Sequence, residues 1–135
     1  MNKRTTIFSL LVVLLVVGAI AGRKFIAPEA CTNGEGETVT INMRSLKNQW
    51  TWEPNPVHVT CGNTVVLNIY NEDTNDHGFA LDVYGINKRL PPEATTTITF
   101  KATNKGEFVF YCSVPCGPGH FEQKGKMIVG EIVDQ

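Results

Sequence analysis

Hydrophobic and polar residues divide the chain into two unlike parts. Residues 7–21 form an apolar run without a charged side chain, and two residues separate this run from the basic residues Lys3 and Arg4. From residue 37 onward, apolar and polar residues alternate over short stretches separated by glycine, proline and asparagine. The pattern therefore predicts a hydrophobic N-terminal helix or signal peptide, followed by a small domain made of β-strands.

The apolar N-terminal run has two interpretations. A basic start, a short apolar stretch and the Ala-Ile-Ala sequence at 19–21 are typical of a cleaved secretory signal peptide. A spanning helix needs about 20 apolar residues, and residues 5–22 barely reach that length. Residues 1–24 are thus a signal peptide or a membrane anchor. In both cases we expect an exported protein, periplasmic or on the extracytoplasmic face of the membrane.

The alternating stretches predict the strands of a domain at residues 37–135, preceded by a linker at 25–36. Alternation is clearest at 38–43 and 95–103. Further strands are expected at 50–52, 57–60, 64–70, 78–84, 107–111 and 126–133, most of them bounded by turn residues. No stretch after residue 21 has apolar residues at helical spacing. Many short strands with frequent turns are typical of an all-β sandwich or barrel.

The overall composition excludes several classes of function. The 135 residues include 12 Lys and Arg against 13 Asp and Glu, so no basic surface for nucleic acid is expected. Cleavage after residue 21 would leave a mildly acidic domain. No nucleophile–base pair, phosphate-binding loop or carboxylate dyad indicates catalysis. We therefore expect a protein that is not an enzyme.

Potential metal ligands gather near the C-terminus. Cys112 and Cys116 are four residues apart, and His120 follows four residues later in a segment rich in glycine and proline. His77 lies 35 residues before Cys112, at the start of a predicted strand. Two thiolates and two imidazoles suit copper or zinc. The second ligand pair of a zinc finger is missing from the sequence.

The cysteines leave alternatives open. An exported chain with four cysteines permits three disulfide pairings, so a Cys112–Cys116 disulfide is the alternative to a metal site. Cys31 and Cys61 have no histidine nearby, and a structural disulfide between them is expected in an oxidising compartment. Trp50 is expected to pack at the core or its rim, with electron relay as the alternative.

These residues carry a resemblance to a known family. The sequence His-Gly-Phe-Ala at 77–80, together with residues 110–120 (Phe-Tyr-Cys-Ser-x-x-Cys-Gly-x-x-His), resembles the cupredoxins of the binuclear copper-A type. These are the copper domains of cytochrome c oxidase subunit II and of nitrous oxide reductase. The resemblance covers about residues 37–133 and implies a Greek-key β-sandwich of the cupredoxin kind.

The resemblance also implies a role for each residue of the cluster. Cys112 and Cys116 would bridge two copper ions through their thiolates, and His77 and His120 would each bind one of these ions. The family further uses a backbone carbonyl two residues after the first cysteine, which in this chain is the carbonyl of Val114. The cofactor expected from the resemblance is therefore copper, with two ions per chain if the site is binuclear.

Gln123 is the main departure from the family pattern. The family has a weak axial thioether three residues after its second histidine, and here that position is Gln123. Glutamine can replace the axial Met of a copper electron-transfer site. As a harder oxygen ligand, it favours Cu(II) and lowers the reduction potential. Met127 would be an alternative ligand only if the loop were re-routed.

The resemblance implies electron transfer in a respiratory chain. The partner would be a c-type cytochrome, another cupredoxin or an oxidase, and the N-terminal segment would attach the chain to a membrane if uncleaved. A mononuclear cupredoxin carrier and a copper chaperone for respiratory enzyme assembly are the alternatives. Many oxidase subunits have a metal-binding acid at the position of Val114 and two transmembrane helices. Because this chain departs on both points, membership of an oxidase-like complex stays open.

Overall fold

The computed structural model describes residues 27–31 and 36–131, which form ten strands and one short 3-10 helix. The strands are β1 (Glu29–Ala30), β2 (Thr38–Ser45), β3 (Trp52–Glu53), β4 (Val57–Thr60), β5 (Thr64–Asn71), β6 (His77–Leu81), β7 (Ile86–Leu90), β8 (Thr95–Lys101), β9 (Asn104–Tyr111) and β10 (Lys124–Gly130); the helix is η1 (Asp82–Tyr84). The expected signal peptide or anchor at 1–24 lies outside the described residues. Within the described ranges, no helix is long and apolar enough to cross a membrane.

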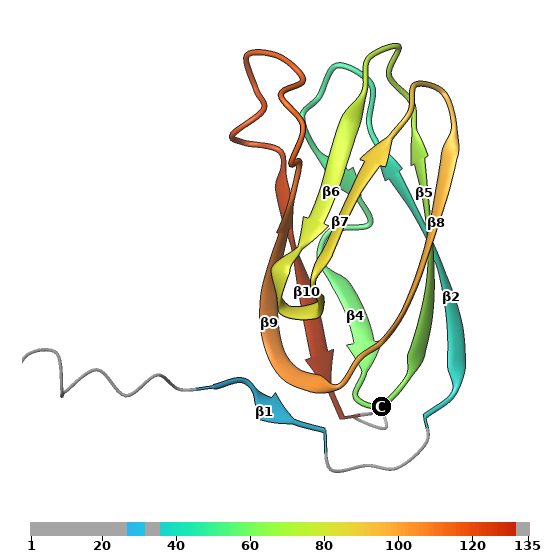
Figure 1. Cartoon of the computed structure of the whole chain (residues 1–135), viewed down its shortest axis with the longest axis vertical. Helices are drawn as coiled ribbons and strands as arrows, with labels where there is room; N and C mark the ends of the chain where they lie inside the picture. The colour runs from blue at the N-terminus through green and yellow to red at the C-terminus, as the bar shows by residue number, and fades with distance from the viewer. Residues whose placement is uncertain (1–26, 32–35, 132–135) are drawn as a thin grey trace, which may run out of the picture.

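Two sheets face each other across the core (Figure 1). One has the strand order β4-β10-β9-β6-β7, with β1 also paired to β9, and the other has the order β3-β2-β5-β8. The β2–β5 and β4–β10 pairs are parallel, and the other pairs are antiparallel. Many neighbouring strands are thus distant in sequence. The prediction of an all-β sandwich is confirmed.

Aromatic packing marks the part of the core nearest the predicted ligands. The rings of Phe79 and Phe110 lie 5.3 Å apart, and Trp52 meets Phe79 edge-on at 5.8 Å. All three side chains are buried. Phe79 and Phe110 each stand two residues from a predicted ligand, so this packing fixes the strand ends that carry His77 and Cys112.

Three strand predictions need correction. β3 begins at Trp52 rather than at residue 50, because Trp50 has a positive φ of 51°. β6 ends at Leu81 rather than at residue 84, because η1 and the left-handed Gly85 turn the chain. β7 (Ile86–Leu90) was not expected at all. Its three central residues are polar and exposed, so the sequence lacks the alternation that marks a half-buried strand. Such a strand is typical of a sheet edge, where β7 lies.

A disulfide joins Cys31, which follows β1, to Cys61, which follows β4, with a Cα–Cα distance of 5.6 Å. Both of these strands end away from the β9–β10 loop (Figure 1). The two cysteines are 30 residues apart in the sequence. A disulfide that closes a loop of that size typically stabilises a domain by about 2–4 kcal/mol. The Cys31 N–H also donates to the Thr103 carbonyl at 2.8 Å. Residues 29–31 fall in the interval expected as a linker, yet they are attached to the sandwich.

Candidate metal centre

The first two predicted ligands come from paired strands. His77 begins β6, and Cys112 directly follows β9. Because Ala80 of β6 lies opposite Tyr111 of β9, the two strands bring these residues to the same end of the sandwich. His77 Nδ1 is 3.8 Å from Cys112 Sγ. The Gly78 N–H points at the same sulfur, at 3.3 Å.

The loop between β9 and β10 curls so that its ligands converge. Cys112 Sγ and Cys116 Sγ are 3.4 Å apart, and His120 Nδ1 lies 3.6 Å from Cys116 Sγ. A disulfide would need about 2 Å, so these cysteines are free thiols and the alternative Cys112–Cys116 disulfide is absent. The ligand atoms of His77, Cys112 and Cys116 all lie within 4.8 Å of one another.

Two oxygen atoms complete the cluster. The Val114 carbonyl is 3.2 Å from Cys112 Sγ. Gln123 Oε1 is 2.8 Å from His77 Nδ1 and 3.5 Å from Cys116 Sγ. The structure therefore brings together all the residues that the sequence analysis named for the site: His77, Cys112, Val114, Cys116, His120 and Gln123. Met127, the alternative to Gln123, is fully buried in β10 as part of the core, and the loop is not re-routed.

Trp50 packs against the β9–β10 loop and lies beside His77. A Cβ on Gly119 would overlap its indole, and a Cβ on Gly117 would lie 2.6 Å from its Cη2 atom. Gly117 also has φ of 137°, in the region that favours glycine. The Trp50 ring centroid is 6.3 Å from that of His77. The glycines of the loop thus admit an aromatic ring that holds the loop beside His77, as the packing interpretation expects.

Hydrogen bonding makes the pKa of the Cys112 thiol much lower than that of the Cys116 thiol. Burial raises the pKa of Cys112, but hydrogen bonds with His77 and from the Gly78 N–H outweigh it and bring the pKa down to about 6. Burial and the hydrogen bond with Cys112 raise the pKa of Cys116 to about 12. The pair therefore holds one proton over the neutral range, with the negative charge mainly on Cys112.

This difference predicts a titration of the metal-free protein. We expect its ultraviolet thiolate absorption to rise near pH 6 by one thiolate per chain, which is that of Cys112. Cys116 titrates much higher, and the disulfide cysteines do not titrate. Replacing Cys112 with Ser should abolish that step, whereas replacing Cys116 with Ser should leave a thiolate step below the ordinary value of 9.0. A first step near the ordinary value of 9.0 would contradict the hydrogen-bonded arrangement.

Asp73 and Ser45 also contact the cluster, and the sequence analysis named neither. Asp73 Oδ2 lies 3.2 Å from His77 Nε2, and Gln123 Nε2 donates to Ser45 Oγ at 2.8 Å. Burial lowers the pKa of His77, but hydrogen bonds to Cys112 and Asp73 outweigh it, so the pKa is raised. Ser45 could have been found, since it continues the inward series of residues 39, 41 and 43 with a polar side chain.

The donor set fits copper. Thiolates and imidazoles are the ligands that copper takes in electron-transfer proteins, and a Gln oxygen is a known weak axial ligand. Each sulfur has one imidazole as a neighbour: His77 Nδ1 lies beside Cys112 Sγ, and His120 Nδ1 lies beside Cys116 Sγ. Among the residues that the structure describes, the carboxylate nearest to the cluster is that of Asp73, which contacts the far nitrogen of His77.

Comparison with known proteins gives relatives of two kinds. Nitrous-oxide reductase of Pseudomonas fluorescens is 37% identical over 71 residues, which cover 50% of this chain and 11% of that protein. Cytochrome c oxidase subunit 2 of Thermus thermophilus is 31% identical over 80 residues, which cover 59% of this chain and 58% of that subunit. The chain thus matches about a tenth of the reductase and somewhat over half of the subunit.

Solved structures share the fold. The periplasmic domain of subunit II of cytochrome oxidase from Bradyrhizobium japonicum superimposes with a TM-score of 0.61 at 23% identity, covering 78% of this chain and 88% of that domain. Auracyanin A, a blue copper protein of Chloroflexus aurantiacus, gives 0.58 at 20% identity, covering 68% of this chain and 98% of auracyanin. The family model described as the cupredoxin-like domain matches residues 10–129. Because that match spans most of the chain, this protein belongs to the cupredoxin-like family.

Proposed function

We propose that this protein is an electron carrier that holds a binuclear, copper-A-like centre. The observation that carries the proposal is the pairing of donors: two sulfurs 3.4 Å apart, with one imidazole beside each. Two thiolates shared by two metal ions, each ion bound by one histidine, would need this set of donors. A mononuclear site would need only one of the two thiols. Similarity to nitrous-oxide reductase and to oxidase subunit 2 supports the same interpretation.

Each ligand has a proposed role. Cys112 and Cys116 bridge the two ions, His77 binds one ion, and His120 binds the other. Gln123 Oε1 would be a weak ligand of the ion that His77 would bind, because these two donor atoms are neighbours at 2.8 Å. The Val114 carbonyl serves the other ion.

The protein's own contribution is rigidity. Bound copper would supply one-electron redox chemistry, and a site that moves little between oxidation states exchanges electrons quickly. The β6–β9 pairing, the packing of Trp50 on the loop and the hydrogen bond from the Cys112 N–H to the Gln123 carbonyl, at 2.9 Å, all hold the ligands in place. An electron carrier needs no vacant coordination position, so we propose no catalytic step.

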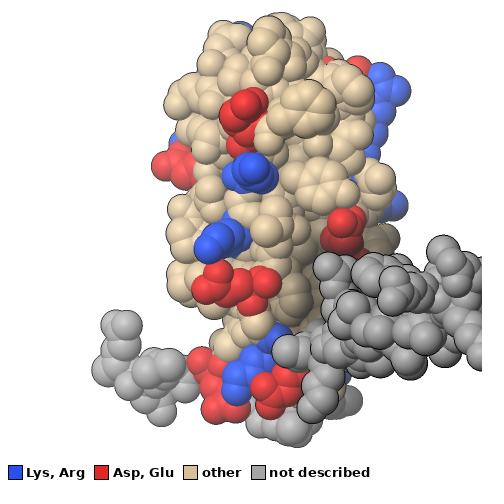
Figure 2. Space-filling model, turned by 90° about the vertical axis from the view of Figure 1, so that its left-hand side faces the viewer, with Lys and Arg blue, Asp and Glu red and all other residues tan. Residues whose placement is uncertain are grey.

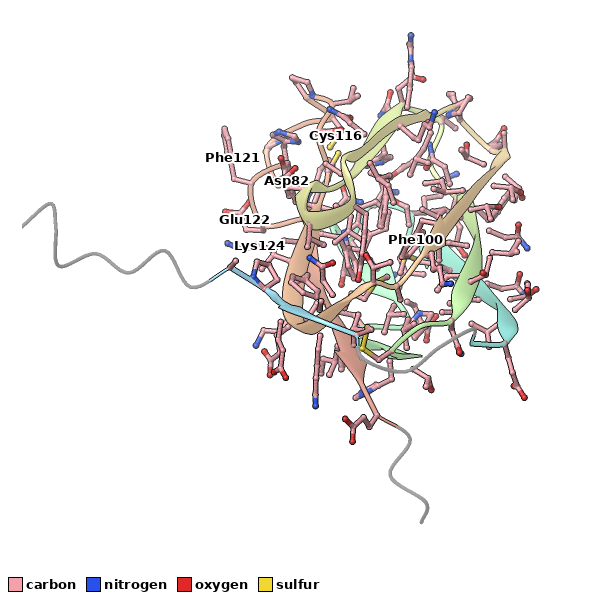
Figure 3. All side chains as sticks on the ribbon, turned by 60° about the horizontal axis from the view of Figure 1, so that its bottom comes forward. Asp82, Phe100, Cys116, Phe121, Glu122 and Lys124 are labelled. Carbon is pink, nitrogen blue, oxygen red and sulfur yellow. A yellow bond between two sulfur atoms is a disulfide. The ribbon has the colours of Figure 1, made fainter. Side chains whose placement is uncertain are left out.

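The surface beside His120 suits a protein partner. Charged side chains gather over the middle and lower parts of this face, and the loop end has few of them (Figure 2). Phe121 is 83% exposed, its ring lies 5.0 Å from that of His120, and it points away from the domain while the Cys116 sulfur points inward (Figure 3). We propose that a c-type cytochrome, another cupredoxin or an oxidase docks here, on the periplasmic or extracytoplasmic side.

Electron exchange with a c-type cytochrome tests this function. The dithionite-reduced, copper-loaded protein should reduce an oxidised c-type cytochrome rapidly and reversibly, and it should keep its copper while doing so. A copper chaperone should instead transfer Cu(I) to a metal-free acceptor protein. Copper loss to such an acceptor without electron exchange would overturn the proposal in favour of the chaperone alternative.

The axial position provides a further prediction. We expect Gln123→Met to raise the reduction potential, because a thioether favours Cu(I) more than an amide oxygen does. Protein-film voltammetry measures the change, and Gln49→Met, the same substitution at an exposed position, should leave the potential unaltered. An unchanged or lower potential in the Gln123 variant would remove Gln123 from the ligand set.

A further inference from the structure

A buried hydrogen bond links the site to the opposite sheet. Gln123 belongs to the loop between β9 and β10, whereas Ser45 ends β2 in the other sheet. Gln123 Nε2 donates to Ser45 Oγ at 2.8 Å. The residues Ser45 and Gln123 are 0% and 1% exposed. Because solvent water reaches neither, each end of the Gln123 amide needs a partner within the protein.

The two ends of this amide have different neighbours. Oε1 faces His77 Nδ1 at 2.8 Å and Cys116 Sγ at 3.5 Å. Within the described part of the chain, Ser45 Oγ is the one hydrogen-bond acceptor found for Nε2. A bound cation would attract the amide oxygen and repel the NH₂ group. Pairing of the NH₂ group with Ser45 therefore leaves the oxygen on the side where a metal would lie.

Ser45 is itself held in place. It lies opposite Asn71 of β5 and Trp52 of β3 in the sheet, and its carbonyl accepts a hydrogen bond from the Glu72 N–H at 3.1 Å. The backbone of Gln123 is fixed from the other side, since its carbonyl accepts from the Cys112 N–H at 2.9 Å. Gln123 is thus restrained at its backbone by the residue that follows β9, and at the tip of its side chain by a residue of the opposite sheet.

We propose that Ser45 is a positioning residue that holds Gln123 Oε1 toward the copper site and thereby helps to set its reduction potential. The inference rests on the proposed function, because Oε1 has an axial role only beside a bound copper. Without the hydroxyl, the buried NH₂ group loses its partner and the amide rotates to find another one. That rotation weakens the oxygen contact, which favours Cu(I) and raises the potential.

Voltammetry of single and double variants tests this role. Ser45→Ala should raise the potential in the same direction as Gln123→Met. It should add nothing further in the double variant, because a thioether at position 123 offers Ser45 no amide. Ser45→Thr, which keeps the hydroxyl, should restore the wild-type potential. The control is Thr97→Val at an exposed position of the same sheet. It removes a hydroxyl that donates to the Asn68 amide oxygen, with an oxygen–oxygen distance of 2.8 Å.

The outcomes separate this inference from the proposed function. A Ser45→Ala protein with normal copper content and an unchanged or lower potential would overturn the role of Ser45 and leave the binuclear centre intact. One copper per wild-type chain would overturn the binuclear centre. If Ser45→Ala binds no copper, NMR of the metal-free protein decides. We expect the side-chain amide protons of Gln123 to exchange faster in that variant, and exchange at the wild-type rate would overturn the inference.

Discussion

Replacing Cys116 with Ser is expected to lower the copper content from two ions per chain to one or none. Cys116 Sγ stands between Cys112 Sγ at 3.4 Å and His120 Nδ1 at 3.6 Å, so its loss removes one bridge and separates His120 from the remaining sulfur. A serine hydroxyl is a hard, weakly acidic donor and does not replace a thiolate toward copper. Metal analysis and the visible absorption spectrum of the purified variant measure the change.

A matched control uses the other pair of cysteines. Replacing both Cys31 and Cys61 with Ser removes two sulfurs that follow β1 and β4, whose ends lie away from the β9–β10 loop. That variant should be less stable, by about 2–4 kcal/mol, yet its folded fraction should bind as much copper as the wild type. Should the Cys116 variant keep two copper ions and an unaltered spectrum, Cys116 would not be a ligand.

The second large effect is expected for Gly78→Ala. A Cβ at this position would lie 2.8 Å from the Val114 nitrogen and 2.9 Å from the Ser113 nitrogen. These are backbone atoms, so the loop itself would have to move away from β6. The Gly78 N–H that contacts Cys112 Sγ at 3.3 Å would move as well. We expect a loss of about 1–3 kcal/mol in the free energy of unfolding, together with weaker copper binding.

Urea unfolding of the metal-free variant and a copper titration test this pair of effects. Gly130→Ala is the control, because a Cβ there would meet no atom within 4 Å. It should leave both the stability and the copper affinity close to wild-type values. Wild-type stability and copper affinity in the Gly78 variant would show that β6 and the ligand loop are less closely packed than the structure indicates.

Local patterns were sufficient to predict much of the fold and of the site. Alternation identified β2 and β8, and β-branched and aromatic residues identified β5. The spacing of Cys112, Cys116 and His120 indicated convergence in one loop. This succeeded because the ligands of one short loop are near each other whatever the rest of the chain does. Strand β7 was missed, since its polar, exposed residues carry no alternating signal.

Contacts between the two sheets could not be predicted from local sequence patterns. The position of Trp50 on the loop depends on how the segment before β3 folds back across the end of the sandwich, which no local pattern encodes. The pairing of Ser45 with Gln123 joins residues 78 positions apart. Sequence alone shows that Ser45 is a polar residue in an inward position; its partner follows only from the packing of the sheets.

Copper stoichiometry, measured together with electron paramagnetic resonance on the same sample, tests the central claim most directly. The proposed centre predicts two copper ions per chain and, in the oxidised protein, one unpaired electron shared equally between them. One copper ion per chain, with its unpaired electron confined to a single nucleus, would contradict the binuclear centre and favour the mononuclear alternative.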